Sequence, residues 1–453
     1  MSGSHDYAEE GTYTVTVTWD LDCPPNPHSA SFQLRVPDAA LTSTANALTA
    51  NAGVPFSGPV ATFTDADPGG TVSDYAATIT WGDGSMTPGS VSPGSGGFVV
   101  SGAHTYGSGG SYPTMVSISD VGGANTVAQS TATVLAAPAP VVTGTPAVSA
   151  STAAFSGAAN PEGLLTTAHF EYGLDLRYVT PGASGPQYDH STPSQSVGSD
   201  FATHSVSASV SGLVPNALYH VRLVATNAAG TTDGPDMTFT TDRGPVPGAP
   251  GLGKTFNVSS TGLVLIEVNG VFIPLTELTK IPNGTIINAL HGTLSLTTAV
   301  PAVQHAVISA KKKKAKTPKT KTQKGKFSGS VFKVTQARSG LATLSLVEGA
   351  KFKGSPTYAS CKAKKGKAVT AALSTKTLQL LHGSAHGKFR TKGRYAAATV
   401  RGTIWTIADR CDGSLTHAIK DSVTVSDFVR HKTIILRPGH SYLALAKPPH
   451  KRK

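Results

Sequence analysis

Nine lysines lie within residues 311–326, a density that favours the binding of a polyanion. Ammonium groups this close together displace counterions from an anionic chain, which makes such binding salt-sensitive. No aromatic side chain interrupts the tract, so bases find no ring to stack on and sequence-specific recognition of nucleic acid is not expected. We predict binding of anionic polymers or polysaccharides of the envelope or matrix; the alternative is a solvated tract without a partner. The lysines are Lys311, Lys312, Lys313, Lys314, Lys316, Lys319, Lys321, Lys324 and Lys326.

The formal net charge of +12 is divided very unevenly along the chain. Residues 1–310 contain 6 Lys and Arg against 21 Asp and Glu, whereas residues 311–453 contain 32 against 5. A second basic cluster at 362–367 and a basic tail at 447–453 extend the positive field. An acidic front joined to a cationic end indicates that the end meets a polyanion, such as a wall polymer, lipid head groups or nucleic acid.

Four aspartates, Asp65, Asp67, Asp74 and Asp83, offer the oxygen ligands that Ca²⁺ prefers. Their spacing does not match an EF-hand loop. Aspartate in a turn also commonly accepts hydrogen bonds from its own backbone. Calcium binding and turn capping are therefore alternatives, and no other cofactor is expected.

Three cysteines are present, Cys23, Cys361 and Cys411. Two cysteines within one exported domain are normally bridged, so we predict a disulfide between Cys361 and Cys411. Cys23 has no evident partner. Zinc is not predicted, because two cysteines without Cys-x2-Cys spacing supply too few ligands.

Two further patterns match ligand motifs but lack the elements that those motifs need. Residues 248–255 fit the phosphate-loop pattern GxxxxGKT, yet a Pro-rich segment precedes them and strand-like sequence follows, where a nucleotide site needs a buried strand and a helix. His382 and His386 have the spacing of a zinc pair on a helix, but the glycines around them disfavour a helix. No nucleophile turn or paired carboxylates are recognisable, so we predict no catalytic residue and expect a protein that is not an enzyme.

Short strands joined by tight turns must carry these side chains. The chain has 48 Gly, 30 Pro and only 14% charged residues, a composition that disfavours long helices. No apolar run approaches the roughly 18–20 residues that cross a bilayer, so no transmembrane segment is expected. A length of 453 residues indicates three or four domains. The predicted fold class is all-β, with tandem immunoglobulin-like sandwiches and a basic C-terminal β domain containing a disordered Lys-rich insertion.

A motif repeated after 99 residues indicates two copies of one domain. The first copy has His5, Tyr7, Gly11 and Tyr13, and the second has His104, Tyr106, Gly110 and Tyr112. Each copy runs into alternating strand sequence. The second copy follows about 60 residues of strand-like sequence, and the first follows only four. We therefore expect Met1 to fall inside a domain, and a signal peptide to lie upstream of it.

Residues 76–84 form an alternating strand that ends in Trp81-Gly-Asp83-Gly, a hairpin signal. This segment, followed by His-x-Tyr, Gly-x-Tyr and a further strand, resembles the PKD (polycystic kidney disease) domain family over about 40–136, with a truncated copy over 1–38. The resemblance implies a β-sandwich that serves as a spacer or binding module in bacterial surface proteins and secreted hydrolases. It assigns structural roles to Trp81, Asp83, Tyr106 and Tyr112.

Leu213-x-Pro215-x3-Tyr219 precedes a strand and resembles the tyrosine corner of fibronectin type III domains, over about 141–242. There the tyrosine hydroxyl bonds an upstream backbone group, so Tyr219 is expected to be structural. Further on, Val400-Arg-Gly-Thr-Ile-Trp-Thr-Ile407 and a closing Leu436-x-x-Gly439 resemble the FecR-type domain. That resemblance implies an envelope-side sensor, but such sensors depend on a membrane segment that is not seen here.

The predicted domain order is a truncated PKD-like domain at 1–38, a PKD-like sandwich at 39–136, a linker at 137–143, a fibronectin-like sandwich at 144–242, a Pro/Gly linker at 243–254, a FecR-like β domain at 255–446 with the insertion at 310–326, and the tail. We expect an extracellular or cell-surface protein for adhesion or spacing, with a cationic domain that binds anionic polymers. The alternatives are an envelope signalling component and the accessory region of a secreted hydrolase.

Overall fold

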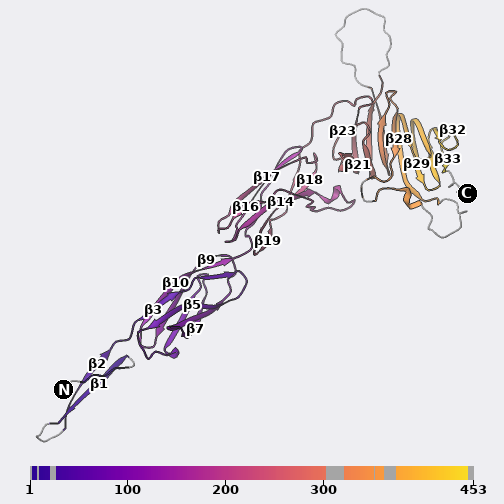
Figure 1. Cartoon of the computed structure of the whole chain (residues 1–453). Coiled ribbons are helices and arrows are strands. Elements are labelled where there is room, and N and C mark those ends of the chain that lie inside the picture. The colour runs from indigo at the N-terminus through magenta and orange to yellow at the C-terminus, as the bar shows by residue number, and fades with distance from the viewer. Residues whose placement is uncertain are drawn as a thin grey trace, which may run out of the picture.

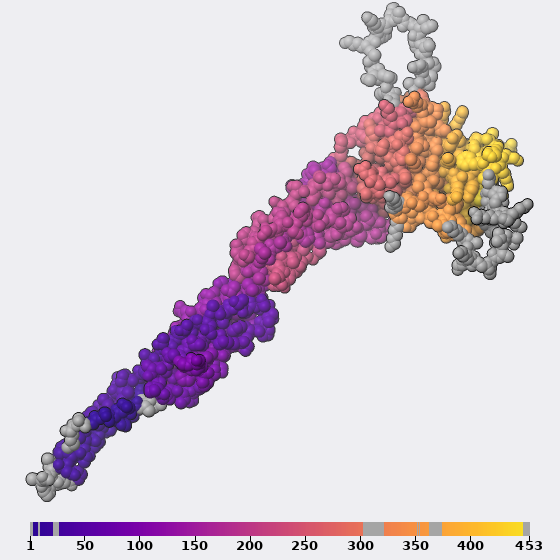
Figure 2. All heavy atoms as spheres, viewed as in Figure 1, coloured from indigo at the N-terminus to yellow at the C-terminus, as the bar shows by residue number. Residues whose placement is uncertain are grey.

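The computed structural model describes residues 3–7, 10–20, 27–301, 321–350, 352, 354–361 and 374–446. These residues form an all-β protein, as the composition predicts, and the domains follow one another along an elongated rod that ends in a broader C-terminal domain (Figures 1 and 2). Among the described residues the only helical elements are three short 3-10 turns. No helix in this part of the chain is long and apolar enough to span a bilayer.

The N-terminal end of the rod is a single hairpin of β1 (Gly11–Trp19) and β2 (His28–Val36) (Figure 1). Val17 and Phe32 on this hairpin are 41% and 54% exposed. Val116, which follows Val17 by the 99-residue offset, is only 3% exposed in the complete second copy. The hairpin therefore repeats the pattern of a sandwich strand pair without a second sheet over its apolar side among the described residues.

The repeated motif forms the same ring cluster in both copies. The ring centroids of His5 and Tyr7 lie 4.6 Å apart at 86°, and those of His104 and Tyr106 have the same separation and angle. In each copy the next tyrosine of the motif also contacts this pair. The sequence repeat is thus a repeat of packing.

The second domain is a sandwich of two sheets joined through β7, with the strand order β3-β5-β8-β7-β6-β9-β10-β4. Its elements are β3 (Leu41–Ala45), β4 (Leu48–Asn51), β5 (Phe56–Asp65), η1 (Val72–Asp74), β6 (Tyr75–Thr80), β7 (Met86–Gly94), β8 (Gly97–His104), β9 (Gly110–Asp120) and β10 (Asn125–Leu135). Side chains that alternate inward along these strands, with the fully buried Trp81 among them, form one core.

The Trp-Gly-Asp-Gly turn and the His-x-Tyr strand end meet at one end of this core. The indole of Trp81 stacks on His104 with centroids 4.9 Å apart, and the His104 ring nitrogen Nε2 lies 2.7 Å from an oxygen of Asp83. The Tyr106 hydroxyl donates to the Trp81 carbonyl at 3.1 Å, and Tyr112 stacks on Tyr106. These residues hold the end of the sandwich together.

The third domain packs two small sheets around a core that contains Phe155, Phe170 and Tyr219. One sheet contains β11, β12, β13 and β17, and the other is centred on β14 and β18. Its elements are β11 (Val141–Thr143), β12 (Ala147–Val148), β13 (Thr152–Ala159), β14 (Thr166–Leu174), η2 (Leu176–Tyr178), β15 (His190–Ser191), β16 (Gln195–Gly198), β17 (His204–Ser211), β18 (Leu218–Asn227), β19 (Gly230–Asp233) and β20 (Met237–Thr240).

Tyr219 lies in a tyrosine corner. Its hydroxyl accepts a hydrogen bond of 2.9 Å from the backbone N–H of Val214, and both residues are buried. Tyr219→Phe is expected to destabilise this domain by about 1–2 kcal/mol, because a buried N–H loses its acceptor. Hydrogen exchange of domain peptides in urea measures the loss. The matched control is Tyr172→Phe, since no hydrogen bond of the Tyr172 hydroxyl occurs among the described residues; an equal loss in both variants would contradict the role of the corner.

The C-terminal domain is one continuous, strongly bent set of strands that encloses a single core. Its elements are β21 (Thr255–Val268), β22 (Val271–Pro274), β23 (Thr279–Pro282), β24 (Ile286–Ala299), β25 (Thr322–Ser328), β26 (Val331–Gln336), β27 (Ala342–Leu346), η3 (Tyr358–Cys361), β28 (Thr377–Lys392), β29 (Ala396–Arg410), β30 (Gly413–Lys420), β31 (Val423–Asp427), β32 (Lys432–Leu436) and β33 (Ser441–Leu445).

Long strands link the two layers of this domain. The first half of β28 pairs with β25 and its second half pairs with β27. In the same way β24 pairs with both β25 and β26, and β29 pairs with both β30 and β31. One layer therefore contains β25, β30 and β33, the other contains β26, β27, β31 and β32, and aromatic residues such as Phe327 and Trp405 fill the space between them.

Hydrogen bonds connect consecutive domains. Asn227 of the third domain donates through its side chain to the carbonyl of Ala136 at 2.8 Å. At the next junction Asn216 donates to the carbonyl of Thr276 at 3.1 Å, and the Thr276 hydroxyl donates to the carbonyl of Pro215 at 2.6 Å. These contacts fix short connections, so the rod in Figure 1 is built from docked domains.

Candidate polyanion-binding face

The lysines of the C-terminal domain that the structure describes have no carboxylate within ion-pair distance. Within the described residues, ion pairs join several histidines and four arginines to carboxylates, and no lysine takes part in one. The arginines are Arg177, Arg222, Arg394 and Arg410. The positive charge of these lysines is therefore uncompensated by the protein itself.

The register of β25 and β28 brings lysines and histidines from two distant segments side by side. Lys324 of β25 pairs with His386 of β28, and Ser328 pairs with His382. Lys326 pairs with Ser384, which lies between the two histidines on β28. Directly opposed residues of neighbouring strands point to the same face, with Cβ atoms about 5 Å apart. The two lysines and the two histidines are all exposed.

The same rows continue onto β29 and β30. Thr406 of β29 pairs with His382 on one side and with His417 on the other. The Nδ1 atom of His417 lies 2.8 Å from the hydroxyl of Ser441 on β33, which extends the row by one more strand. Lys420 lies at the end of β30, where that strand still pairs with β29.

We call this surface the His–Lys face and define it by its cationic and titratable side chains. They are Lys324, Lys326, His382, His386, His417 and Lys420. The other residues in these rows are mainly serine and threonine, and none of those described is a carboxylate. At one end a cavity of about 610 Å³ is lined by His386, Lys388 and Arg401.

Alternation along the strands explains why the cations point outward. Alternate residues of β25 are buried, so Lys324 and Lys326 between them face solvent. The same alternation on β28 exposes His382 and His386. Gly383 lies under the face against the indole of Trp405, and a Cβ atom there would come within 2.7 Å of the ring. The apolar inner side therefore fixes the register of the charged outer side.

Lys324 and Lys326 lie two residues apart on the same side of β25 and repel one another, and no carboxylate on this face offsets the cost. An anionic chain lying across the strands would remove that repulsion. The arrangement is thus suited to several parallel contacts with a polymer of repeating negative charge.

Histidines are used differently in the front of the chain. His104, His169, His190, His204 and His220 each lie within ion-pair distance of a carboxylate. Among the described residues no histidine after residue 254 has such a partner. The contrast separates structural histidines of the rod from unpaired histidines of the C-terminal domain.

The predicted lysine tract only partly coincides with this face. Lys311, Lys312, Lys313, Lys314, Lys316 and Lys319 lie outside the described residues, as does the cluster at 362–367. The expected disorder up to residue 326 is wrong at its end, because β25 begins at Thr322 and buries alternate side chains. Lys321 precedes this strand, and Lys324 and Lys326 are part of it. His382, His386, His417 and Lys420 were missed, since their common surface depends on strand register.

The four predicted calcium ligands do not form one set. Asp74 precedes β6 and Asp83 follows it, so six strand residues, about 20 Å, separate them. Asp83 instead contacts Ser85 and His104; burial opposes its ionisation, but hydrogen bonds from these two residues lower the pKa of Asp83 to about 2. A shared site that includes Asp83 is therefore ruled out.

Asp65, Asp67 and Asp74 accept hydrogen bonds from nearby backbone N–H groups, as turn-capping aspartates do. They also line a cavity of about 60 Å³ that Glu10 and Asp120 share. The three predicted ligands other than Asp83 thus lie together, beside carboxylates that the sequence did not indicate.

Glu10, Asp38 and Asp120 form the tightest group of carboxylates among the described residues, with oxygens within 4.8 Å of one another. Asp38 also accepts a hydrogen bond from the backbone of Ala124. Burial raises the pKa of Asp120, and the charges of Asp38 and Asp65 add to the effect. Oxygen ligands of this kind suit Ca²⁺, although carboxylates also gather at domain junctions without an ion.

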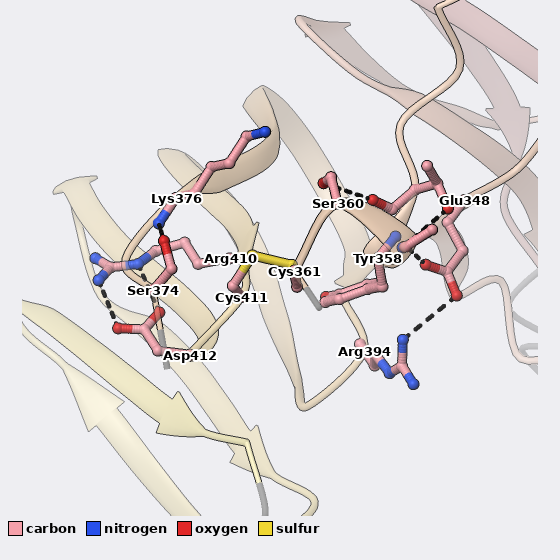
Figure 3. The surroundings of a disulfide bond; sticks show 12 residues. Glu348, Tyr358, Ser360, Cys361, Ser374, Lys376, Arg394, Arg410, Cys411 and Asp412 are labelled. Atoms are coloured by element: carbon pink, nitrogen blue, oxygen red, sulfur yellow. Dashed lines mark hydrogen bonds and ion pairs between the residues drawn. A yellow bond between two sulfur atoms is a disulfide. The ribbon is translucent and has the colours of Figure 1, made fainter. Parts of the chain in front are cut away.

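The predicted disulfide between Cys361 and Cys411 is present (Figure 3). It ties the short turn η3 to the connection between β29 and β30. Beside it Arg394 lies over the ring of Tyr358 at 4.2 Å and pairs with Glu348. Cys23 lies outside the described residues.

Neither of the two patterns that match ligand motifs, residues 248–255 and the pair His382 and His386, has the surroundings of a ligand site. The GxxxxGKT segment runs directly into β21 rather than a helix, and the N–H of Gly253 donates to the side chain of Gln336. His382 and His386 lie on β28, four residues apart along a strand, which separates them by about 13 Å.

Comparison with known proteins gives no family. No family model matches the chain, and no curated protein matches it. Solved structures with some similarity include the FN1–FN3 domains of chicken CNTN1, at 14% identity over 50% of this chain and 76% of that one, with a TM-score of 0.17. A segment of titin gives 15% identity over 52% and 75% of the two chains, with a TM-score of 0.22. At these scores the all-β fold rests on the sheets described above.

Proposed function

We propose that this chain is a non-enzymatic extracellular or cell-surface protein that holds an anionic polymer on its C-terminal domain and spaces it with a rod of β-sandwiches. The observation that carries the proposal is the His–Lys face, where lysines and histidines from three strands share one surface without a carboxylate. Adhesion to envelope or matrix polymers follows if the other end of the rod is held elsewhere.

The rod supports a spacing role. Hydrogen bonds dock the third domain against the second domain and against the C-terminal domain, so these three domains keep their separation along the rod. The front is acidic while the end is basic, which keeps the front from competing for the same ligand. A disulfide is typical of proteins exported to an oxidising compartment.

The His–Lys face differs from a lysine tract because its lysines are held at fixed backbone positions. Strand β25 holds Lys324 and Lys326 about 7 Å apart along the backbone, so less backbone freedom is lost when a ligand binds. The lysines at 311–319 supply further charge in the sequence directly before this strand. Ordered and tract lysines together provide many weak, salt-dependent contacts.

Lys324→Gln combined with Lys326→Gln is expected to weaken binding of dextran sulfate by about tenfold at low salt, since two contacts are lost. Titration by fluorescence anisotropy or calorimetry at pH 7 measures the change in the full chain. The slope of log affinity against log salt concentration should become shallower by between one and two.

The matched control is Lys333→Gln with Lys392→Gln, which removes the same charge from the other layer of the domain. We expect this pair to change affinity less than the β25 pair. Equal losses would show that total charge, and not the face, governs binding. Absence of binding by the natural chain would overturn the proposed function itself.

A further inference from the structure

We infer that the affinity of the His–Lys face for a polyanion depends on pH. His382, His386 and His417 add positive charge to the face on acidification, so the protein binds its polyanion tightly at mildly acidic pH and weakly above neutrality. This inference rests on the proposed function and adds its regulation. Histidine is the side chain whose charge changes between about pH 5 and pH 8.

The geometry places the three imidazoles among fixed cations. His386 faces Lys324 on β25, while Lys388 lies two residues further along β28 and Arg401 is next to the β29 residue that pairs with His386. No anionic side chain is in these rows. A proton taken up by His386 therefore strengthens a positive surface instead of completing an ion pair.

The surroundings of His382 are also free of carboxylates. It faces Ser328 on β25 and Thr406 on β29, and Lys326 is the nearest charged residue by register. The exposed His291 of β24 lies beyond the pair that Ser328 makes with that strand. No carboxylate of these rows therefore lies opposite the His382 ring.

His417 faces Thr406 on β29 and Ser441 on β33, with Lys420 on its own strand. The acidic residues closest in sequence, Asp412 and Asp421, lie beyond the two ends of β30. Asp412 is already paired with Arg410 at 2.7 Å. No carboxylate of the rows opposes the protonated ring.

The paired histidines of the rod provide the contrast. His220 lies between two carboxylates, with its ring nitrogens 2.7 Å and 3.1 Å from Asp236 and Asp175. The positive charge of a protonated His220 is therefore balanced by carboxylates of its own domain. On the His–Lys face the added charge is displayed to a ligand, and lysines alone supply the charge at alkaline pH.

Dextran sulfate is the probe for the test, because its sulfate groups stay ionised throughout this pH range and only the protein titrates. At constant low salt, affinity of the full chain is expected to rise by about 10- to 100-fold from pH 8 to pH 5.5. The salt slope should steepen by about two to three over the same interval, as three contacts are added.

The variant His382→Gln, His386→Gln, His417→Gln should retain the pH 8 affinity and lose most of the rise. His431→Asn is the control: this residue lies in the turn between β31 and β32, away from the face. Circular dichroism of each variant checks that the fold is kept.

Binding that is equal at both pH values, or a rise that survives in the triple variant, would overturn the inference while leaving the proposed function intact. A loss of the rise in His431→Asn equal to that in the triple variant would also overturn it, because the effect would not belong to the face. No binding at either pH would instead remove the proposed function.

Discussion

Asp175→Ala is expected to lower the free energy of unfolding of the third domain by about 2–4 kcal/mol, because the buried His220 ring, the half-exposed Arg177 side chain and two backbone N–H groups lose their shared acceptor. Asp175 is 2% exposed. It accepts hydrogen bonds from the N–H and Nε of Arg177 at 2.9 and 2.8 Å and from the N–H of Gly185 at 3.2 Å. The oxygen that accepts from Gly185, Oδ2, also lies 3.1 Å from Nε2 of His220.

Asp175→Asn provides the matched control, since the amide keeps the volume and one acceptor oxygen but not the charge. Its loss should be smaller than that of the alanine variant. Hydrogen exchange by mass spectrometry resolves peptides of 141–242 from those of 41–135, which serve as an internal reference. If both variants match the natural chain in exchange of the third domain, the network does not stabilise it.

The same network predicts a pH dependence whose two signs differ. Burial opposes ionisation of Asp175, but hydrogen bonds from Arg177 and His220 outweigh it and hold the pKa of that carboxyl well below its usual range. Stability from Asp175 is therefore complete above about pH 4 and is lost as pH falls further. Burial would lower the pKa of His220, yet Asp236 and Asp175 raise it, so its contribution is complete below about pH 6.5 and is lost as pH rises. The effect of Asp175→Ala should be larger at pH 5.5 than at pH 8.5.

Local patterns in the sequence were sufficient to single out Trp81 and Tyr219 as structural residues of the second and third domains. The turn after Trp81 and the strand end at His104 carry short-range signals, and the ring cluster that they form lies within one sandwich. Tyr219 is placed by a motif of seven residues whose hydrogen bond spans only five positions. Contacts of this range can be inferred because the turn geometry alone brings the groups together.

The candidate face depends on longer range. Lys324 and His386 are 62 residues apart and meet only through the register of β25 and β28, which the buried Phe327 and Leu381 determine. A shift of one residue would turn every cation inward, and composition does not specify the register. For the same reason the sequence does not distinguish β25 from the charged tract before it. The buried positions Gln323 and Gly325 are polar or small, so the strand lacks the apolar alternation by which strands are recognised.

Two smaller features show the same limit. The segment expected to be a linker at 137–143 ends in β11, whose pairing with β13 is a tertiary contact that proline-rich composition hides. Asp74 and Asp83 are only nine positions apart in the sequence, but strand β6 lies between them and carries them to opposite ends of the sheet. Distance in an extended segment grows by about 3.3 Å per residue, so sequence proximity is a poor guide there.

Removing the disulfide with Cys361→Ser and Cys411→Ser is expected to destabilise the C-terminal domain by about 4 kcal/mol. The bridge closes a loop with a sequence separation of 50, and a loop of that length loses roughly that much chain entropy in the unfolded state. For a domain of this size the midpoint of its thermal transition should fall by about 10 °C. The transitions of the other domains should remain where they are, since the bridge joins two positions of one core.

Differential scanning calorimetry of the full chain measures this shift, and Cys23→Ser controls for the loss of a thiol as such. Cys411 is buried and its N–H donates to the carbonyl of Lys376, so the serine variant keeps the backbone contact that positions the start of β28 against the end of β29. Dextran sulfate should raise the lowered midpoint, because a ligand that binds only the folded domain stabilises it by mass action. An unchanged midpoint in the double variant would mean that the bridge does not restrain this domain. If the polymer fails to raise the lowered midpoint, the folded C-terminal domain does not bind it. That result would contradict the proposed face, although the bridge would still be shown to stabilise the domain.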